Sequence, residues 1–202
     1  MKKIIIILLT LTLGLELHAQ VEIIDVNQKL DEAQTAYKSG DLESSRFALQ
    51  EALQGINQAI GREILGLLPQ ELFGLPKIES GDNVTGTNIM FAGLFVNRRY
   101  EAETKNASVE IVSDSPLMAG INAFMALPAF MVSDPNQKRI KVGNYKGMLT
   151  KSEDTEGNIS YSAQIPIGST LFTLTTNGID DEKLITDALT QMEIGKIAKI
   201  AE

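Results

Sequence analysis

The side chains of this chain that could do chemistry are carboxylates, lysines, arginines and tyrosines, because the sequence has no cysteine and one histidine. That histidine, His18, lies among the first 19 residues, which we expect to be cleaved off. The remaining chain would lack both residue types. Their absence excludes Ser-His-Asp and Cys-His nucleophilic catalysis, acid–base chemistry by histidine and the usual zinc sites. We find no catalytic constellation, and we expect no metal and no cofactor.

Two acidic runs have residue types that could bind a cation. The run 153–158 alternates oxygen-bearing side chains, but a calcium loop needs an acid near its twelfth position, and Ile165 stands there when Asp154 is counted first. We therefore interpret this run as a solvated hairpin tip. The run 180–182 is interpreted as the start of a helix, where acidic residues are favoured.

Arg98 and Tyr100 are candidate binding residues on a predicted strand. Side chains alternate along a strand, so these two share one face and Arg99 takes the other. Arginines here could hold an anionic ligand, or they could pair with acids across the sheet. The candidate acids are Glu101, Glu103 and Glu110.

The segment 117–131 is predicted to be a helix with almost no polar face. Such a helix is either buried or contacts something apolar. Phe124, Met125, Phe130 and Met131 are its candidate binding residues, since methionine and phenylalanine make an adaptable surface. The alternative is a core helix between the sheet and the N-terminal helices. No charge accompanies the stripe, which disfavours a membrane-surface helix with a basic face.

Residues 1–19 have the order of a cleavable secretory signal. A positive start is followed by an apolar run over residues 4–15 and then by small and polar residues, and cleavage is predicted after Ala19. The apolar run is shorter than the roughly 20 residues that span a bilayer. We expect an exported protein, in a bacterial periplasm or secreted.

The composition indicates a globular acidic protein. The chain has a net charge of −8 and is 44% hydrophobic, which is enough to form a sizeable core. Loss of two lysines and one glutamate with residues 1–19 would change the net charge to −9. Such a charge repels phosphate backbones, so a nucleic-acid partner is excluded.

Residues 20–71 are predicted to form a helical hairpin. Apolar residues recur at helical spacing, first at Val26, Leu30, Ala33 and Tyr37, then at Leu49, Leu53, Ile56, Ile60, Ile64 and Leu67. Asp25 is the expected N-cap of the first helix. Gly40 closes it, Asp41 caps the second, and Pro69 ends the second.

The run Ala33-x-x-x-Tyr37-x-x-Gly40-Asp41, with Ala48 and Ala52 after it, resembles one tetratricopeptide-type hairpin. The likeness covers about thirty residues and departs from the repeat where Ser44 and Ser45 replace the usual alanine. No second copy follows, and one repeat cannot bury its own face. We therefore expect a hairpin docked on the rest of the chain and carry over no peptide recognition.

Residues 72–86 are predicted as a linker, and residues 87–202 as an α+β domain with a mainly antiparallel sheet. A helix is expected within this sheet region, and one C-terminal helix is expected to begin at Asp180. The predicted strands lie within 87–103, 108–112, 139–142, 145–151, 159–165 and 170–176. The element order is similar to that of PsbP/Mog1-like modules, and this analogy carries no site.

Three functions are compatible with the sequence. The first is an exported, non-catalytic envelope protein that binds a protein partner or an apolar ligand. The second is a carboxylate-based hydrolase of the glycan type, which needs neither histidine nor cysteine. The third is a purely structural envelope factor.

Overall fold

The computed structural model describes residues 23–86, 93–113, 118, 120 and 134–201. It has the predicted α+β fold: two N-terminal helices, a seven-stranded antiparallel sheet and two C-terminal helices. The predicted signal peptide lies outside the described residues. So does most of the predicted helix 117–131, of which Met118 and Gly120 are described as helical.

The N-terminal hairpin consists of α1 (Val26–Ser39) and α2 (Leu42–Leu67). Its predicted caps are confirmed: Asp25 accepts from two backbone amides of α1, and Asp41 accepts from the amide of Ser44. Gly40 ends α1 with φ 83°, a left-handed conformation that glycine adopts without strain.

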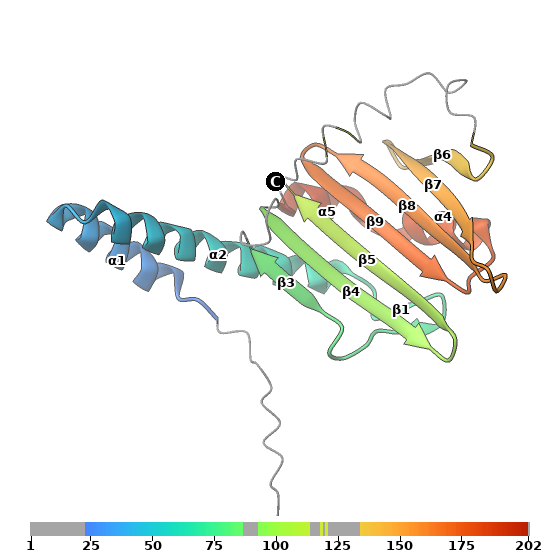
Figure 1. The fold of residues 1–202 in the computed structure, drawn as a ribbon, viewed down its shortest axis with the longest axis horizontal. Coiled ribbons are helices and arrows are strands. Elements are labelled where there is room, and N and C mark those ends of the chain that lie inside the picture. The colour runs from blue at the N-terminus through green and yellow to red at the C-terminus, as the bar shows by residue number, and fades with distance from the viewer. Residues whose placement is uncertain (1–22, 87–92, 114–117, 119, 121–133, 202) are drawn as a thin grey trace, which may run out of the picture.

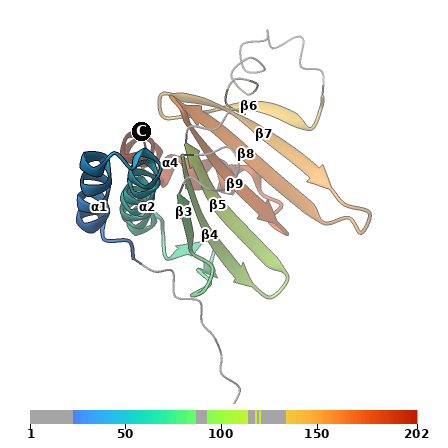
Figure 2. The same cartoon turned by 60° about the vertical axis from the view of Figure 1, so that its left-hand side comes forward.

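The hairpin projects beyond one end of the sheet (Figure 1), and α2 lies between α1 and the sheet (Figure 2). Glycines allow both close contacts of α2. A Cβ on Gly55 would lie 2.8 Å from Val26 in α1, and one on Gly61 would lie 2.2 Å from Val84 in β3. The N-terminal half of α2 therefore packs on α1 and its C-terminal half on the sheet.

The stretch 72–86, predicted as a linker, contains short strands. After β1 (Glu71–Leu72), β2 (Leu75–Pro76) pairs with it, and β3 (Asn83–Gly86) joins the large sheet at its edge.

The large sheet has the strand order β3-β4-β5-β9-β8-β7-β6, with every neighbouring pair antiparallel. The remaining strands are β4 (Leu94–Ala102), β5 (Lys105–Ser113), β6 (Gln137–Val142), β7 (Tyr145–Glu153), β8 (Ile159–Ile167) and β9 (Thr170–Asn177).

One face of this sheet forms the core with the helices. Val96, Val109, Leu174 and Ile165 are fully buried on it, and Ile64 of α2 is equally buried. Each such side chain contributes roughly 1.5–3 kcal/mol when it leaves water.

The C-terminal region contains two helices, α4 (Glu182–Gln191) and α5 (Ile194–Ala201), where one was predicted. The chain is extended at Met192, which separates them, and the N-cap is Asp181 rather than Asp180. None of the helices in the described part of the chain is both long and apolar enough to cross a membrane.

Candidate functional site

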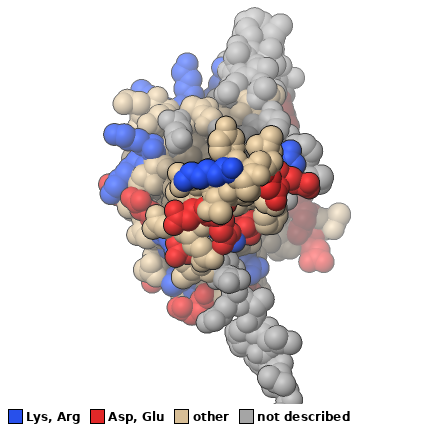
Figure 3. Space-filling view, turned by 90° about the vertical axis from the view of Figure 1, so that its left-hand side faces the viewer, with Lys and Arg blue, Asp and Glu red and all other residues tan. Residues whose placement is uncertain are grey.

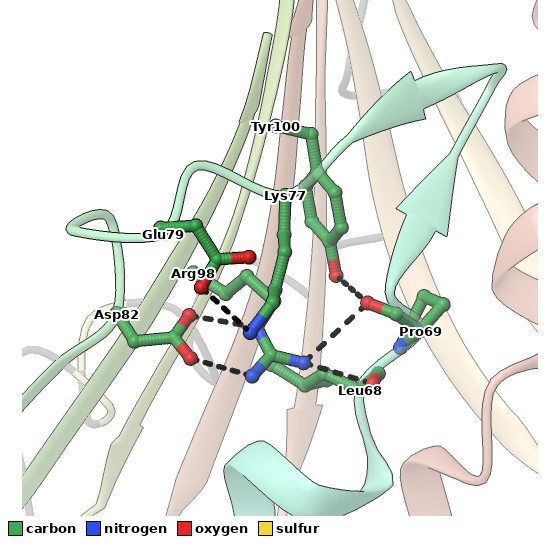
Figure 4. Close-up of polar contacts among 7 residues, drawn as sticks. All are labelled: Leu68, Pro69, Lys77, Glu79, Asp82, Arg98 and Tyr100. Carbon is green, nitrogen blue, oxygen red and sulfur yellow. Dashed lines mark hydrogen bonds and ion pairs between the residues drawn. The ribbon is translucent and has the colours of Figure 1, made fainter.

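Arg98, one of the predicted binding residues, is buried and fully engaged within the protein (Figure 4). Its Nε and Nη2 donate to the two carboxylate oxygens of Asp82 at 2.7 and 2.6 Å, and its Nη1 donates to the carbonyl oxygen of Leu68 at 2.9 Å. A bidentate pair of this kind is geometrically specific. The guanidinium thus joins the end of α2 to the loop before β3 and to β4.

The partner of Arg98 differs from the predicted one. We expected an acid on a neighbouring strand, such as Glu101, Glu103 or Glu110. Asp82 takes this place because the segment between α2 and β3 folds back over the buried face of β4. Sequence spacing gave no signal for it, since Asp82 lies 16 residues away in the predicted linker.

Tyr100, the second predicted binding residue, is fully buried beside Arg98. Its hydroxyl donates to the carbonyl oxygen of Pro69 at 2.9 Å. Burial raises the pKa of Tyr100 from its ordinary value of 10.0 to about 12, and the cation of Arg98 acts in the opposite direction. Both side chains thus make contacts that position α2 on the sheet.

The remaining predicted binding residues, Phe124, Met125, Phe130 and Met131, lie outside the described residues.

The apolar stripe of α2 is buried in one half of the helix and exposed in the other. Ile64 is fully buried, whereas Leu49, Leu53 and Ile56 are 50%, 48% and 42% exposed. The N-terminal half of the stripe is exposed because this half of α2 extends beyond the end of the sheet (Figure 1).

Leu30 of α1 adds to the exposed half of the stripe and is itself 45% exposed. The pair Lys29–Glu51, 3.0 Å apart, marks one side of the hairpin. Successive residues of a helix are about 100° apart. On α1, Leu30 therefore lies about 100° around the helix from Lys29, and on α2, Leu49 lies about 160° from Glu51. We define Leu30, Leu49, Leu53 and Ile56 as the hairpin apolar face.

The contact between α1 and α2 uses small residues instead. Ala33 is buried on α1, and Ser45, Ala48, Ala52 and Gly55 are buried on the facing side of α2. Small side chains let the two helices approach closely, but they bury little apolar area. The large apolar residues of the hairpin are therefore left on its outside.

The hairpin apolar face has no acidic residue within it. The acids of the same part of α2, Glu43 and Glu51, lie about 120° or more around the helix from Leu49. Arg46 lines the hollow between α1 and α2 together with Lys29 and Glu51. Figure 3 looks at the projecting end, where acidic side chains gather near the middle of the view, below a basic side chain.

Among the carboxyl groups of the described residues, that of Glu110 has the environment that best suits acid–base chemistry. Burial raises its pKa above the ordinary value, and it lies opposite Asn97 and Thr173 on the face of the sheet away from the helices. Glycoside hydrolysis requires a second carboxylate nearby. The cross-strand neighbours of Glu110 supply none.

The acidic run 153–158 is a hairpin tip, as predicted. Asp154 accepts from the backbone amides of Glu156 and Asn158 and from the side-chain amide of Asn158, all at 2.8–2.9 Å. These bonds hold the pKa of Asp154 below its ordinary value. Within the described part of the chain, no three acidic residues gather in a way that could hold a metal ion.

A surface hollow lies between the β1–β2 turn and α4. Phe73, Leu184 and Met192 line it together with Glu71 and Asp187. Phe73 is in the left-handed region at φ 58°, which is uncommon for an aromatic residue.

Comparisons with protein-family models, curated proteins and solved structures give no match to this chain. The resemblances to tetratricopeptide and PsbP/Mog1-like modules therefore stay predictions.

Proposed function

We propose that this chain is an exported, non-catalytic envelope protein that associates with a protein partner through the hairpin apolar face. The observation that carries the proposal is the exposure of Leu30, Leu49, Leu53 and Ile56 on one side of a projecting hairpin. On soluble proteins, a contiguous exposed apolar patch often marks an interaction site. Export rests on the signal-like order of residues 1–19.

The partner is expected to present an apolar helical face. α2 already packs against a helix within the chain, because it contacts α5, and Ile64 of α2 and Ile197 of α5 belong to one core cluster. Leucine and isoleucine at i, i+4 and i+7 repeat this chemistry in the exposed half. A helix with matching apolar residues would continue the interface that α5 begins.

A protein partner fits the surface better than a small apolar ligand does. Small ligands bind in concave sites that enclose most of their surface. The hollow between α1 and α2 is lined largely by polar and charged residues, including Lys29, Glu32 and Glu51. The hairpin apolar face lies on the outer surface of two helices, a shape suited to a second packed layer.

The hydrolase alternative has less support. It needs a carboxyl group with a raised pKa beside a second carboxylate. Glu110 has the first property without the second among its cross-strand neighbours, and Lys29 lowers the pKa of Glu32, a carboxyl that lines a hollow.

Site-specific photo-crosslinking tests the proposal. A photoreactive residue at Leu53 in the producing cell should yield a cross-linked protein adduct. The same residue at Leu184, a leucine of α4 that is 44% exposed, should yield much less. Equal adduct yield at the two positions, or none at Leu53, would contradict the proposal. Recovery of the chain in the cytoplasmic fraction would contradict export.

A further inference from the structure

We infer that the partner of the hairpin apolar face is a second copy of this chain. This inference rests on the proposed function and names the occupant of the same surface. Two hairpins would meet face to face and form a four-helix bundle around a two-fold axis, with one sheet at each end.

The division of large and small residues in the hairpin supports this pairing. A lone two-helix unit would be most stable with its large apolar residues between the helices. Here Ala33, Ser45 and Ala48 lie between them, and Leu49 and Leu53 lie outside. This is the arrangement of one layer of a four-helix bundle, in which the large residues form the core between layers. An identical hairpin supplies an identical second layer.

The charge distribution supports it as well. Each copy is acidic, with a net charge of −8 for the full sequence, so two copies repel each other over most of their surfaces. The hairpin apolar face lacks acids, and the nearby Glu51 is held on the other side of the hairpin by Lys29. This is a surface on which two acidic chains can meet without opposing carboxylates. A partner of strongly basic or acidic character would find no complementary charge on it.

Two contacts between α1 and α2 show where along the hairpin the apolar face lies. The hydroxyl of Ser45 donates to the carbonyl oxygen of Ala33 near the tip, and Val26 lies against Gly55 near the base. Leu30, Leu49 and Leu53 lie between these levels, on the part of the hairpin that projects beyond the end of the sheet (Figure 1), and Ile56 lies next to the base contact.

The test is the mass of the protein in solution, measured by light scattering during gel filtration of the full chain as the cell delivers it. The mass should rise with concentration from that of one chain to that of two. Leu53→Glu should keep the single-chain mass at every concentration, and the matched control Leu184→Glu should behave as the parent does. Added salt should strengthen the pairing, because it screens repulsion between two acidic chains.

Leu53→Ser serves as a second variant that removes apolar surface without adding charge, and it should also remain a single chain. A parent that stays monomeric at the highest concentration would overturn the second-copy inference. So would equal pairing of Leu53→Glu and the parent, or growth beyond two chains. A monomeric parent with a cross-linked adduct of a different protein at Leu53 would leave the proposed function standing. Loss of folding in both Leu53 variants would overturn both proposals, because the residue would then belong to the core.

Discussion

The hydroxyl of Ser45 donates a 3.0 Å hydrogen bond to the carbonyl oxygen of Ala33, and this contact holds α2 against α1. A serine at this position satisfies its own hydroxyl and still permits a close approach of the two helices. The large residues Leu49 and Leu53 are then directed away from the helix contact. Together with Ala48, Ala52 and Gly55, this small residue sets which side of α2 contacts α1.

Replacement of Gly40 by valine should destabilise the hairpin by about 1–2 kcal/mol, the usual strain of a non-glycine residue in the left-handed region. Gly40 has φ 83°, and a Cβ there would meet no atom within 4 Å, so the cost is conformational rather than steric. Gly66→Ala is the control. Gly66 lies inside α2 without a positive φ or a close neighbour, so alanine should stabilise by about 0.5–1 kcal/mol. Urea unfolding measures both, and equal effects of the two changes would contradict the assignment.

Removal of the Asp82 carboxylate should destabilise the fold strongly. Asp82→Ala leaves the buried guanidinium of Arg98 without its counter-ion, at a cost of about 2–4 kcal/mol. Glu79→Ala is the matched control in the same loop, because Glu79 is 91% exposed and 3.8 Å from Lys77. Its effect should stay within about 0.5 kcal/mol. Thermal unfolding of the two variants checks this, and a mild effect of Asp82→Ala would show that the pair is dispensable.

Stability should fall with rising pH through the titration of Tyr100. The folded protein keeps the phenol proton up to about pH 12, whereas the unfolded chain releases it near 10.0. The folded state therefore binds more protons in this interval, and stability declines by up to about 1.4 kcal/mol per pH unit. Tyr100→Phe should show a shallower decline between pH 10 and 12 in urea titrations, and an unchanged slope would contradict the buried phenol.

The recovered protein should begin at Gln20. Cleavage after Ala19 removes the apolar run 4–15, and the product should be found with the soluble envelope or the medium. N-terminal sequencing of the fractionated protein decides this. Intact Met1 in the membrane pellet would contradict the signal-peptide prediction.

Local chemistry was sufficient to predict the starts and ends of the first elements. Asp25, Gly40 and Asp41 act through contacts within four residues, so their types and spacing carry the information. Alternation in β4 likewise places Arg98 and Tyr100 on one face, as predicted, because strand geometry is itself local.

The sequence did not show which residues far apart along the chain come together, or which part of a helix the sheet covers. Leu53 and Ile64 share one stripe and similar chemistry, yet one is 48% exposed and the other fully buried, because the sheet covers only part of α2. The pairing of Arg98 with Asp82 also depends on how a segment without periodicity folds back. The break between α4 and α5 at Met192 has no glycine or proline within it, and the nearest glycine, Gly195, lies inside α5.

Single spin labels test most directly whether the hairpin apolar face pairs with that of a second copy. The chain contains no cysteine, so Leu53→Cys provides one labelling site and Leu184→Cys a matched control. Labels at position 53 should show a magnetic dipolar coupling between copies that disappears when unlabelled parent is added in excess, and labels at position 184 should show none comparable. The account would be contradicted if labels at position 53 showed no coupling at concentrations where the parent protein is paired. Equal coupling at both positions would also contradict it.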